Sequence, residues 1–149
     1  MKPPAEFKVM RVRECVAPAD LVDTPERAYQ YWRANILTAP WFDPAKEAFV
    51  VLILNTRRRI IGHNLVALGG LDSVHVAPRE LFRPAIVAAG AAIILMHNHP
   101  SGDPTPSEAD IRVTRDFVRA GQLLKIEVLD HVVAALDSHK SLREMGLWA

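Results

Sequence analysis

The sequence predicts an α/β layered domain built on a mixed β-sheet. Segments rich in β-branched and apolar residues alternate with segments whose apolar residues recur at helical spacing, a pattern typical of strands covered by helices. Two strand segments, residues 47–55 and 59–70, are separated only by a polar turn and predict an antiparallel hairpin. A sheet that contains both a hairpin and helical crossovers has strands running in both directions.

Length and composition fit one domain. The chain has 149 residues, half of them hydrophobic, which is enough to bury a layered core. Eighteen basic and seventeen acidic residues give a formal net charge of +1, so no overall field draws the chain to DNA or to an anionic membrane, and any DNA contact would be local. The single cysteine, Cys15, excludes an internal disulfide and a multi-cysteine zinc site. We therefore expect a reducing compartment, the cytoplasm.

The chain is expected to divide into an N-terminal arm or edge strand at residues 1–22 and a domain at residues 23–149. Charges and prolines stand near the N-terminus where a signal peptide needs an apolar segment, so we expect this part to be retained. The longest apolar run, residues 85–96, is far short of the roughly 20 residues that cross a bilayer. The sequence predicts no membrane span.

The first half of the domain begins with a helix at residues 23–37, in which Thr24 is a cap and Pro25 occupies the first turn. The hairpin follows, and we interpret the arginines in its turn as a solvated end and not as a DNA contact. A short strand is expected at 72–77 and a helix at 78–90, opened by proline and ended by Gly90.

The second half repeats the alternation. A central strand is expected at residues 91–96, a helix at 107–124 with Gly121 near its end, and a strand at 125–136. A final turn of helix is expected within 141–149.

The central strand leads into the segment HNHPSGDPTPSEAD, residues 97–110. Alternate strand residues point to one face, so His97 and His99 can approach a single point. The prolines and glycine after them predict a turn, and Thr105 with Glu108 forms a capping-box pattern that predicts the start of the next helix. That helix can direct Asp110 back toward the imidazoles.

Two histidines, a carboxylate and an open fourth position form the ligand set of a catalytic Zn²⁺ ion. Such an ion lowers the pKa of its water to about 7 and activates it for attack on a carbonyl. Glu47 begins an apolar strand, where a carboxylate needs a partner, and we expect it to be the general base and acid. Ser107 is expected to hydrogen-bond the developing oxyanion.

Other polar residues of this region have simpler interpretations. Asp103 is a competing ligand, but an aspartate between proline and glycine more often shapes the turn. The remaining histidines lack a partner at ligand spacing and are interpreted as surface or hydrogen-bonded core residues; they are His63, His75, His131 and His139. Asp130 precedes His131 on a strand, so the two side chains should face opposite ways and form no dyad.

The sequence resembles the JAB/MPN domain of the JAMM metallopeptidase superfamily. The signature of that superfamily is an upstream glutamate, then HxH, seven residues, a serine, two residues and an aspartate. Glu47, His97, His99, Ser107 and Asp110 match it. More narrowly, segments covering most of residues 47–135 resemble the C-terminal domain of the RadC family, long labelled as DNA repair proteins.

The resemblance implies a cytidine-deaminase-like fold, a three-layer α/β/α sandwich. It also implies zinc on His97, His99 and Asp110, Glu47 as acid and base, and Ser107 supporting the tetrahedral intermediate. Superfamily relatives with this set cleave peptide or isopeptide bonds, often beside ubiquitin-like tails. We expect no helix-hairpin-helix region, usual before the RadC domain, in this sequence, because a short arm and a helix stand there instead, and this weakens the expectation of direct DNA binding.

We therefore expect a zinc-dependent hydrolase, a JAMM-type metallopeptidase acting on a peptide or protein. Two alternatives stay open: a DNA-repair-associated protein acting on or with DNA, and a non-catalytic interaction module. His97 and His99, one residue apart at the end of a strand, differ from the dispersed histidines of HNH nucleases. A zinc deaminase is excluded because it needs paired cysteines.

Overall fold

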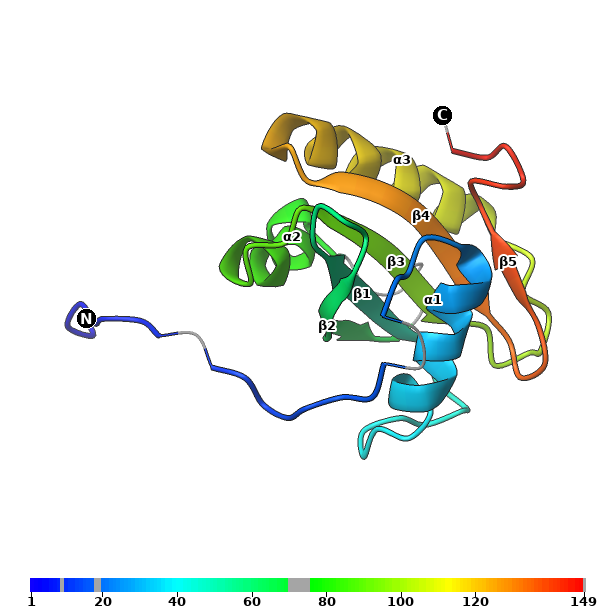
Figure 1. The fold of residues 1–149 in the computed structure, drawn as a ribbon, viewed down its shortest axis with the longest axis horizontal. Helices are drawn as coiled ribbons and strands as arrows, with labels where there is room; N and C mark the ends of the chain where they lie inside the picture. Colours follow the sequence, from blue (N-terminus) through cyan, green and yellow to red (C-terminus); the bar gives the residue numbers. More distant parts are fainter. Residues whose placement is uncertain (9, 18–19, 70–75, 149) are drawn as a thin grey trace.

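Figure 1 shows the fold in a computed structural model, which describes residues 1–8, 10–17, 20–69 and 76–148. The elements follow in the order α1 (Pro25–Tyr31), η1 (Trp32–Ile36), β1 (Ala48–Leu54), β2 (Ile60–Leu68), α2 (Pro78–Val87), β3 (Ala92–Asn98), α3 (Glu108–Leu124), β4 (Glu127–Ala134) and β5 (His139–Ser141). The five strands form one open sheet in the order β2-β1-β3-β4-β5. β1 pairs antiparallel with both β2 and β3, whereas β3 and β4 are parallel and connected through α3. The predicted hairpin and mixed sheet are confirmed.

Helices cover both faces of the sheet, so the molecule has three layers (Figure 1). Alternate residues of strand β1, which lies between β2 and β3, serve two separate cores: Val50 and Leu52 pack with α1 and η1, while Val51 and Ile53 pack with α2 and α3. Every residue of β1 and of β3 is buried. This explains why both strands are near-continuous apolar runs without polar alternation, and it confirms the α/β/α sandwich.

The first helix has the predicted start. The hydroxyl of Thr24 accepts a hydrogen bond from the backbone N–H of Arg27 at 3.2 Å, and Pro25 occupies the first turn. The helix continues as a π-helix to Ile36. The Tyr29 hydroxyl donates to the backbone oxygen of Ala135 at 2.8 Å, which ties α1 to the chain just beyond β4.

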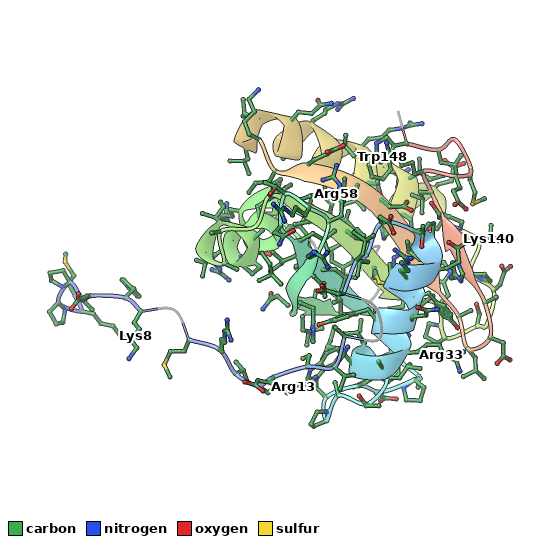
Figure 2. The ribbon with its side chains drawn as sticks, viewed as in Figure 1. Lys8, Arg13, Arg33, Arg58, Lys140 and Trp148 are labelled. Carbon is green, nitrogen blue, oxygen red and sulfur yellow. The ribbon has the colours of Figure 1, made fainter. Side chains whose placement is uncertain are left out.

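The polar turn of the hairpin is held by ion pairs at the protein surface. Arg58, labelled in Figure 2, contacts Glu127 at 3.1 Å, and Arg59 contacts Asp20. Both arginines have partners within the chain, which agrees with the interpretation of this turn as a solvated end.

Two expected elements and one unexpected strand differ from the sequence-based prediction or lie partly outside the described residues. Most of the strand expected at 72–77 lies outside the described residues. Within the helical turn expected at 141–149, residues 142–146 form hydrogen-bonded turns, one of them closed by the Met145 N–H on the Ser141 carbonyl four residues earlier, and no longer helix follows among the described residues. β5 was not expected; its three residues are too few to show a strand pattern, and its pairing with β4 defines it.

The N-terminal arm extends away from the sheet, as the labelled Lys8 and Arg13 show in Figure 2. Among the described residues of 1–17 there is neither helix nor strand. Its base is fixed by Asn35, whose side chain accepts from the Val16 N–H at 2.9 Å and donates to the Val16 carbonyl at 2.6 Å. In the described part of the chain, no helix has the length and apolar character needed to span a membrane.

His63 on β2 lies beside this base. Its Nδ1 is 2.8 Å from the Tyr31 hydroxyl. Burial, with a smaller contribution from the Arg13 guanidinium, lowers the pKa of His63 to about 4. The folded protein therefore resists protonation of this imidazole.

Gly121 lies near the end of α3, as expected, and its contribution is to packing. The helix α3 ends at Leu124, and Lys125 provides the left-handed residue that terminates it. A methyl group on Gly121 would lie 2.5 Å from the backbone oxygen of Ile126 and 3.1 Å from a methyl of Val128. The glycine therefore permits close contact between α3 and β4.

We predict that Gly121→Ala destabilises the protein by about 1–3 kcal/mol, because backbone must move to admit the methyl group. Chemical denaturation measures the free energy of unfolding. Gly62→Ala is the matched control, since a methyl group there meets nothing within 4 Å. Equal stabilities of the two variants would contradict the packing role of Gly121.

A second prediction concerns acid stability. The unfolded chain protonates His63 near pH 6.5, whereas the folded protein does so only near pH 4. The stability that depends on neutral His63 is therefore present above pH 6.5 and is lost as the pH falls toward 4. The free energy of unfolding of the wild type, relative to His63→Gln, should fall over this interval and stay constant between about pH 7 and 8. A constant difference at every pH would refute it.

Candidate metal centre

The predicted metal ligands meet where β3 ends and α3 begins. His97 is the penultimate residue of β3, and His99 follows the strand directly, with its N–H donating to the Ala134 carbonyl at 3.0 Å. Asp110 lies in the first turn of α3. The strand and the helix are separate rigid elements, so the position of each ligand is fixed by its own backbone.

The three ligand atoms form a nearly equilateral triangle. His97 Nε2 lies 3.0 Å from His99 Nε2 and 3.2 Å from Asp110 Oδ2, and His99 Nε2 lies 3.3 Å from the same oxygen. A tetrahedral ion with ligand distances of about 2.0–2.2 Å separates its ligand atoms by about 3.3–3.6 Å. The triangle is only slightly smaller than this, so the three residues could hold a metal ion.

A true capping box places Asp110. Its Oδ2 accepts the Ser107 N–H at 2.8 Å, while the Ser107 hydroxyl oxygen accepts the Asp110 N–H at 3.1 Å. The predicted capping box of Thr105 and Glu108 is therefore wrong: the cap is Ser107, and the helix begins at Glu108, one residue later than expected. Thr105 is used elsewhere, since its N–H and its hydroxyl both donate to the Asp103 carboxylate.

The site favours an ionised carboxylate. Burial alone would raise the pKa of Asp110, but hydrogen bonds from His97 and His99 outweigh burial and hold this pKa well below its usual range. The hydrogen bond to Asp110 in turn raises the pKa of His99. A negative oxygen beside two imidazoles is the charge arrangement that a divalent cation needs.

The site opens to solvent on the side of His99. The His99 side chain is 14% exposed, whereas those of His97 and Asp110 are 1% and 4% exposed. A water molecule or a substrate must therefore approach past His99. The imidazole of His99 is itself oriented by the backbone oxygen of Asp103, 2.9 Å from its Nδ1. The Asp103 side chain is exposed and bonded to Thr105, so it is not grouped with the ligands.

Glu47 is half-buried directly before β1, close enough to His99 for its charge to raise the pKa of that imidazole. Asn98, between the two histidines, fixes the backbone on both sides of Glu47. Its Oδ1 accepts from the Ala48 N–H at 2.7 Å, and its Nδ2 donates to the Lys46 carbonyl at 3.0 Å. The end of β3, which carries His97 and leads into His99, thus also positions the neighbouring carboxylate.

Ser107 is exposed beside this group. Among the described contacts its hydroxyl oxygen acts only as an acceptor, toward the Asp110 N–H, so the hydroxyl hydrogen is available to a ligand. The structure thus gives Ser107 a full structural role as a helix cap and leaves one donor unused.

The sequence interpretation missed the connection of His131 to the site. His131 is fully buried on β4, and its Nε2 lies 2.7 Å from Nδ1 of His97. A β-bulge in β4, opposite Ile93 and Ile94, shifts the strand so that His131 pairs with Leu95 and joins the α3 side. Asp130 instead accepts from Ser141, and no dyad forms, as expected. A histidine inside an apolar strand needs a polar partner, which was the available signal.

A surface groove lies away from the candidate metal centre. It has a volume of about 720 Å³ and is bordered by β2, α2 and the end of α3. None of the five predicted site residues lines it.

Comparison with known proteins identifies relatives of this chain. The chain is 44% identical over 105 residues to a UPF0758 protein of Desulforamulus reducens, an alignment that covers 70% of this chain and 46% of the relative. It is 48% identical over 101 residues to a UPF0758 protein of Bacillus cereus, covering 68% and 45%. A UPF0758 protein of Methanosarcina barkeri is 44% identical over 101 residues, covering 68% and 44%.

The chain therefore spans about half the length of the curated relatives it matches. The family described as the RadC-like JAB domain matches residues 22–147, which include the capped helix α1, the whole sheet and all five residues of the predicted site. The chain belongs to the RadC-like JAB domain family.

Proposed function

We propose that this protein is a zinc-dependent hydrolase of the JAMM type that cleaves a peptide or isopeptide bond. The observation that carries the proposal is the convergence of His97 Nε2, His99 Nε2 and a carboxylate oxygen of Asp110, with Glu47 beside the exposed imidazole. Two imidazoles and one carboxylate leave a coordination position free, as catalytic zinc sites do.

The residues present fit zinc. Imidazole nitrogen and carboxylate oxygen are both ordinary zinc ligands. The three atoms are spaced nearly as three corners of a tetrahedron around an ion, and zinc has no geometric preference of its own that opposes this. When bound, zinc lowers the pKa of a water molecule and polarises the carbonyl of the amide.

The protein supplies the proton transfers. Glu47 is proposed to take a proton from the attacking water and to deliver it to the leaving amine nitrogen, which must be protonated to depart. Its half-buried position on the open side of the site, next to His99, is compatible with both transfers.

Ser107 is proposed to stabilise the oxyanion that forms on the attacked carbonyl. Its free hydroxyl hydrogen can donate while its oxygen still caps α3. The cap holds the donor in place before the reaction, so no reorganisation is required as the negative charge develops.

The proposed substrate is a peptide or a protein, including the extended tail of a ubiquitin-like protein. The ligands lie at the rim of a sheet whose described surface opens at His99, so an extended chain can reach them without entering a deep cavity. The chain spans about half the length of its relatives, so what a whole protein of this family would cleave is likewise a proposal.

The first test concerns zinc and Glu47. We predict about one zinc ion per chain by elemental analysis, and release of new amino termini from a peptide library detected by mass spectrometry. Glu47→Gln should bind the same amount of zinc but lose activity by about 10²–10⁴-fold, because only the proton carrier is removed.

His97→Ala is the companion variant and should lose both zinc and activity. Cleavage that persists unchanged in zinc-free protein, or in Glu47→Gln with zinc bound, would eliminate the proposed mechanism.

The second test concerns Asn98. Its replacement by alanine frees the backbone on both sides of Glu47, and displacement of a catalytic group by about 1 Å costs about 10²-fold in rate. We predict such a loss in kcat for Asn98→Ala with zinc content unchanged. Asn64→Ala, which removes an exposed asparagine of β2, is the control and should keep full activity. Equal rates in both variants would show that the Asn98 contacts do not position Glu47.

A further inference from the structure

A chain of buried side chains extends from the metal centre to the first turns of α3. His97 Nδ1 lies 2.7 Å from His131 Nε2, and His131 Nδ1 lies 2.6 Å from the Thr114 hydroxyl oxygen. That oxygen lies 2.6 Å from the backbone oxygen of Asp110. His131 and Thr114 are completely buried, so no water molecule replaces these contacts.

The Asp110 carbonyl, at the far end of this series of hydrogen bonds, fixes the direction of each of them. Two oxygens 2.6 Å apart need a hydrogen between them, and the Asp110 carbonyl has none to give, so the Thr114 hydroxyl donates to it. A hydroxyl has one hydrogen. The Thr114 oxygen must therefore accept from His131, which places the His131 proton on Nδ1.

The remaining proton positions follow. An uncharged imidazole has one proton, and that of His131 is on Nδ1, so its Nε2 is the acceptor for His97 Nδ1, 2.7 Å away. With Nδ1 donating to His131, His97 turns Nε2 toward His99 and Asp110, and Nε2 is the nitrogen whose electron pair an ion would use. A metal ion binds an imidazole nitrogen only through that pair.

We infer that Thr114 and His131 are positioning residues of the metal centre, which hold the proton of His97 on Nδ1 and keep Nε2 free to bind the ion. This inference rests on the proposed metal binding by His97. Thr114 and His131 do not reach the ligand triangle themselves and act on it only through His97. It assigns to α3 two connections with the site: the Asp110 side chain enters the triangle, and the Asp110 carbonyl orients the chain behind it.

The effect of removing the hydroxyl can be stated in advance. Thr114→Val leaves the His131 Nδ1 proton without an acceptor in a buried site, an unfavourable state. Moving that proton to Nε2 satisfies it only if His97 Nδ1 becomes an acceptor, which transfers the His97 proton to Nε2. A metal ion could then bind His97 Nε2 only after the proton on that nitrogen had left. Loss of such supporting hydrogen bonds weakens metal affinity by about 10–100-fold.

The experiment combines imidazole ¹⁵N NMR of the zinc-free protein with zinc titration against a competing chelator. The wild type should show protons on Nδ1 of both His97 and His131. In Thr114→Val the imidazole signals should shift toward the Nε2-protonated forms, and the dissociation constant for zinc should rise about 10–100-fold. Thr114→Ser restores the hydroxyl and should recover both properties.

Ser141→Ala is the matched control. It also removes a buried hydroxyl, one that donates to Asp130 at 2.6 Å and has no contact with His97. It should lower stability and leave zinc affinity unchanged. This separates a specific effect of Thr114 from general loosening of the fold.

Unchanged tautomers and zinc affinity in folded Thr114→Val would overturn the inference, and so would equal weakening by Ser141→Ala. The failure of the proposed function looks different. In that case the wild type binds no zinc or cleaves no amide, while the NMR result for the zinc-free protein still decides the proton positions of His97 and His131.

Discussion

The carboxylate of Asp110 connects the fold to the candidate metal centre. One of its oxygens caps α3 through the Ser107 N–H and also faces both imidazoles. The start of the helix and the third corner of the ligand triangle are therefore the same interaction. A helix that began elsewhere would move the carboxylate, and a carboxylate drawn away from the histidines would release the cap. This dual use explains why the segment between strand and helix is rich in prolines and turn-forming residues, since it must deliver one residue to one place.

Strand β3 provides the other half of the arrangement. It is buried along its whole length and pairs with a strand on each side, so its end is a fixed point. His97 and His99 face the helix α3, while Asn98 between them reaches the backbone around Glu47. Successive residues of one strand thus perform two tasks, because alternate side chains diverge. The candidate metal ligands on the β3 side and the proposed proton carrier inherit their relative positions from the register between β1 and β3.

The sequence predicted the layered architecture because each layer leaves a local pattern. The buried strands are continuous apolar runs, α1 has its Thr24 cap, and the hairpin is marked by a polar turn. Its error at the start of α3 came from two capping patterns that overlap within a few residues. Thr105 matches one and Ser107 matches the other, and propensity alone does not choose between them. The choice depends on Asp103, which takes the Thr105 hydroxyl, and on the imidazoles that attract Asp110.

The candidate ligand set could be predicted from the sequence. A strand followed by a turn and a helix brings residues at the spacing of His97, His99 and Asp110 close together. The positions of Glu47 and His131 relative to that set were decided only by the tertiary structure. Glu47 is brought to the site by strand pairing across some fifty residues, and His131 is turned toward it by a bulge in β4. Neither event has a local signature, because pairing and bulges arise from contacts between strands and not from the order of residues within one of them. Short-range spacing therefore specified the candidate ligands, and long-range packing specified what supports them.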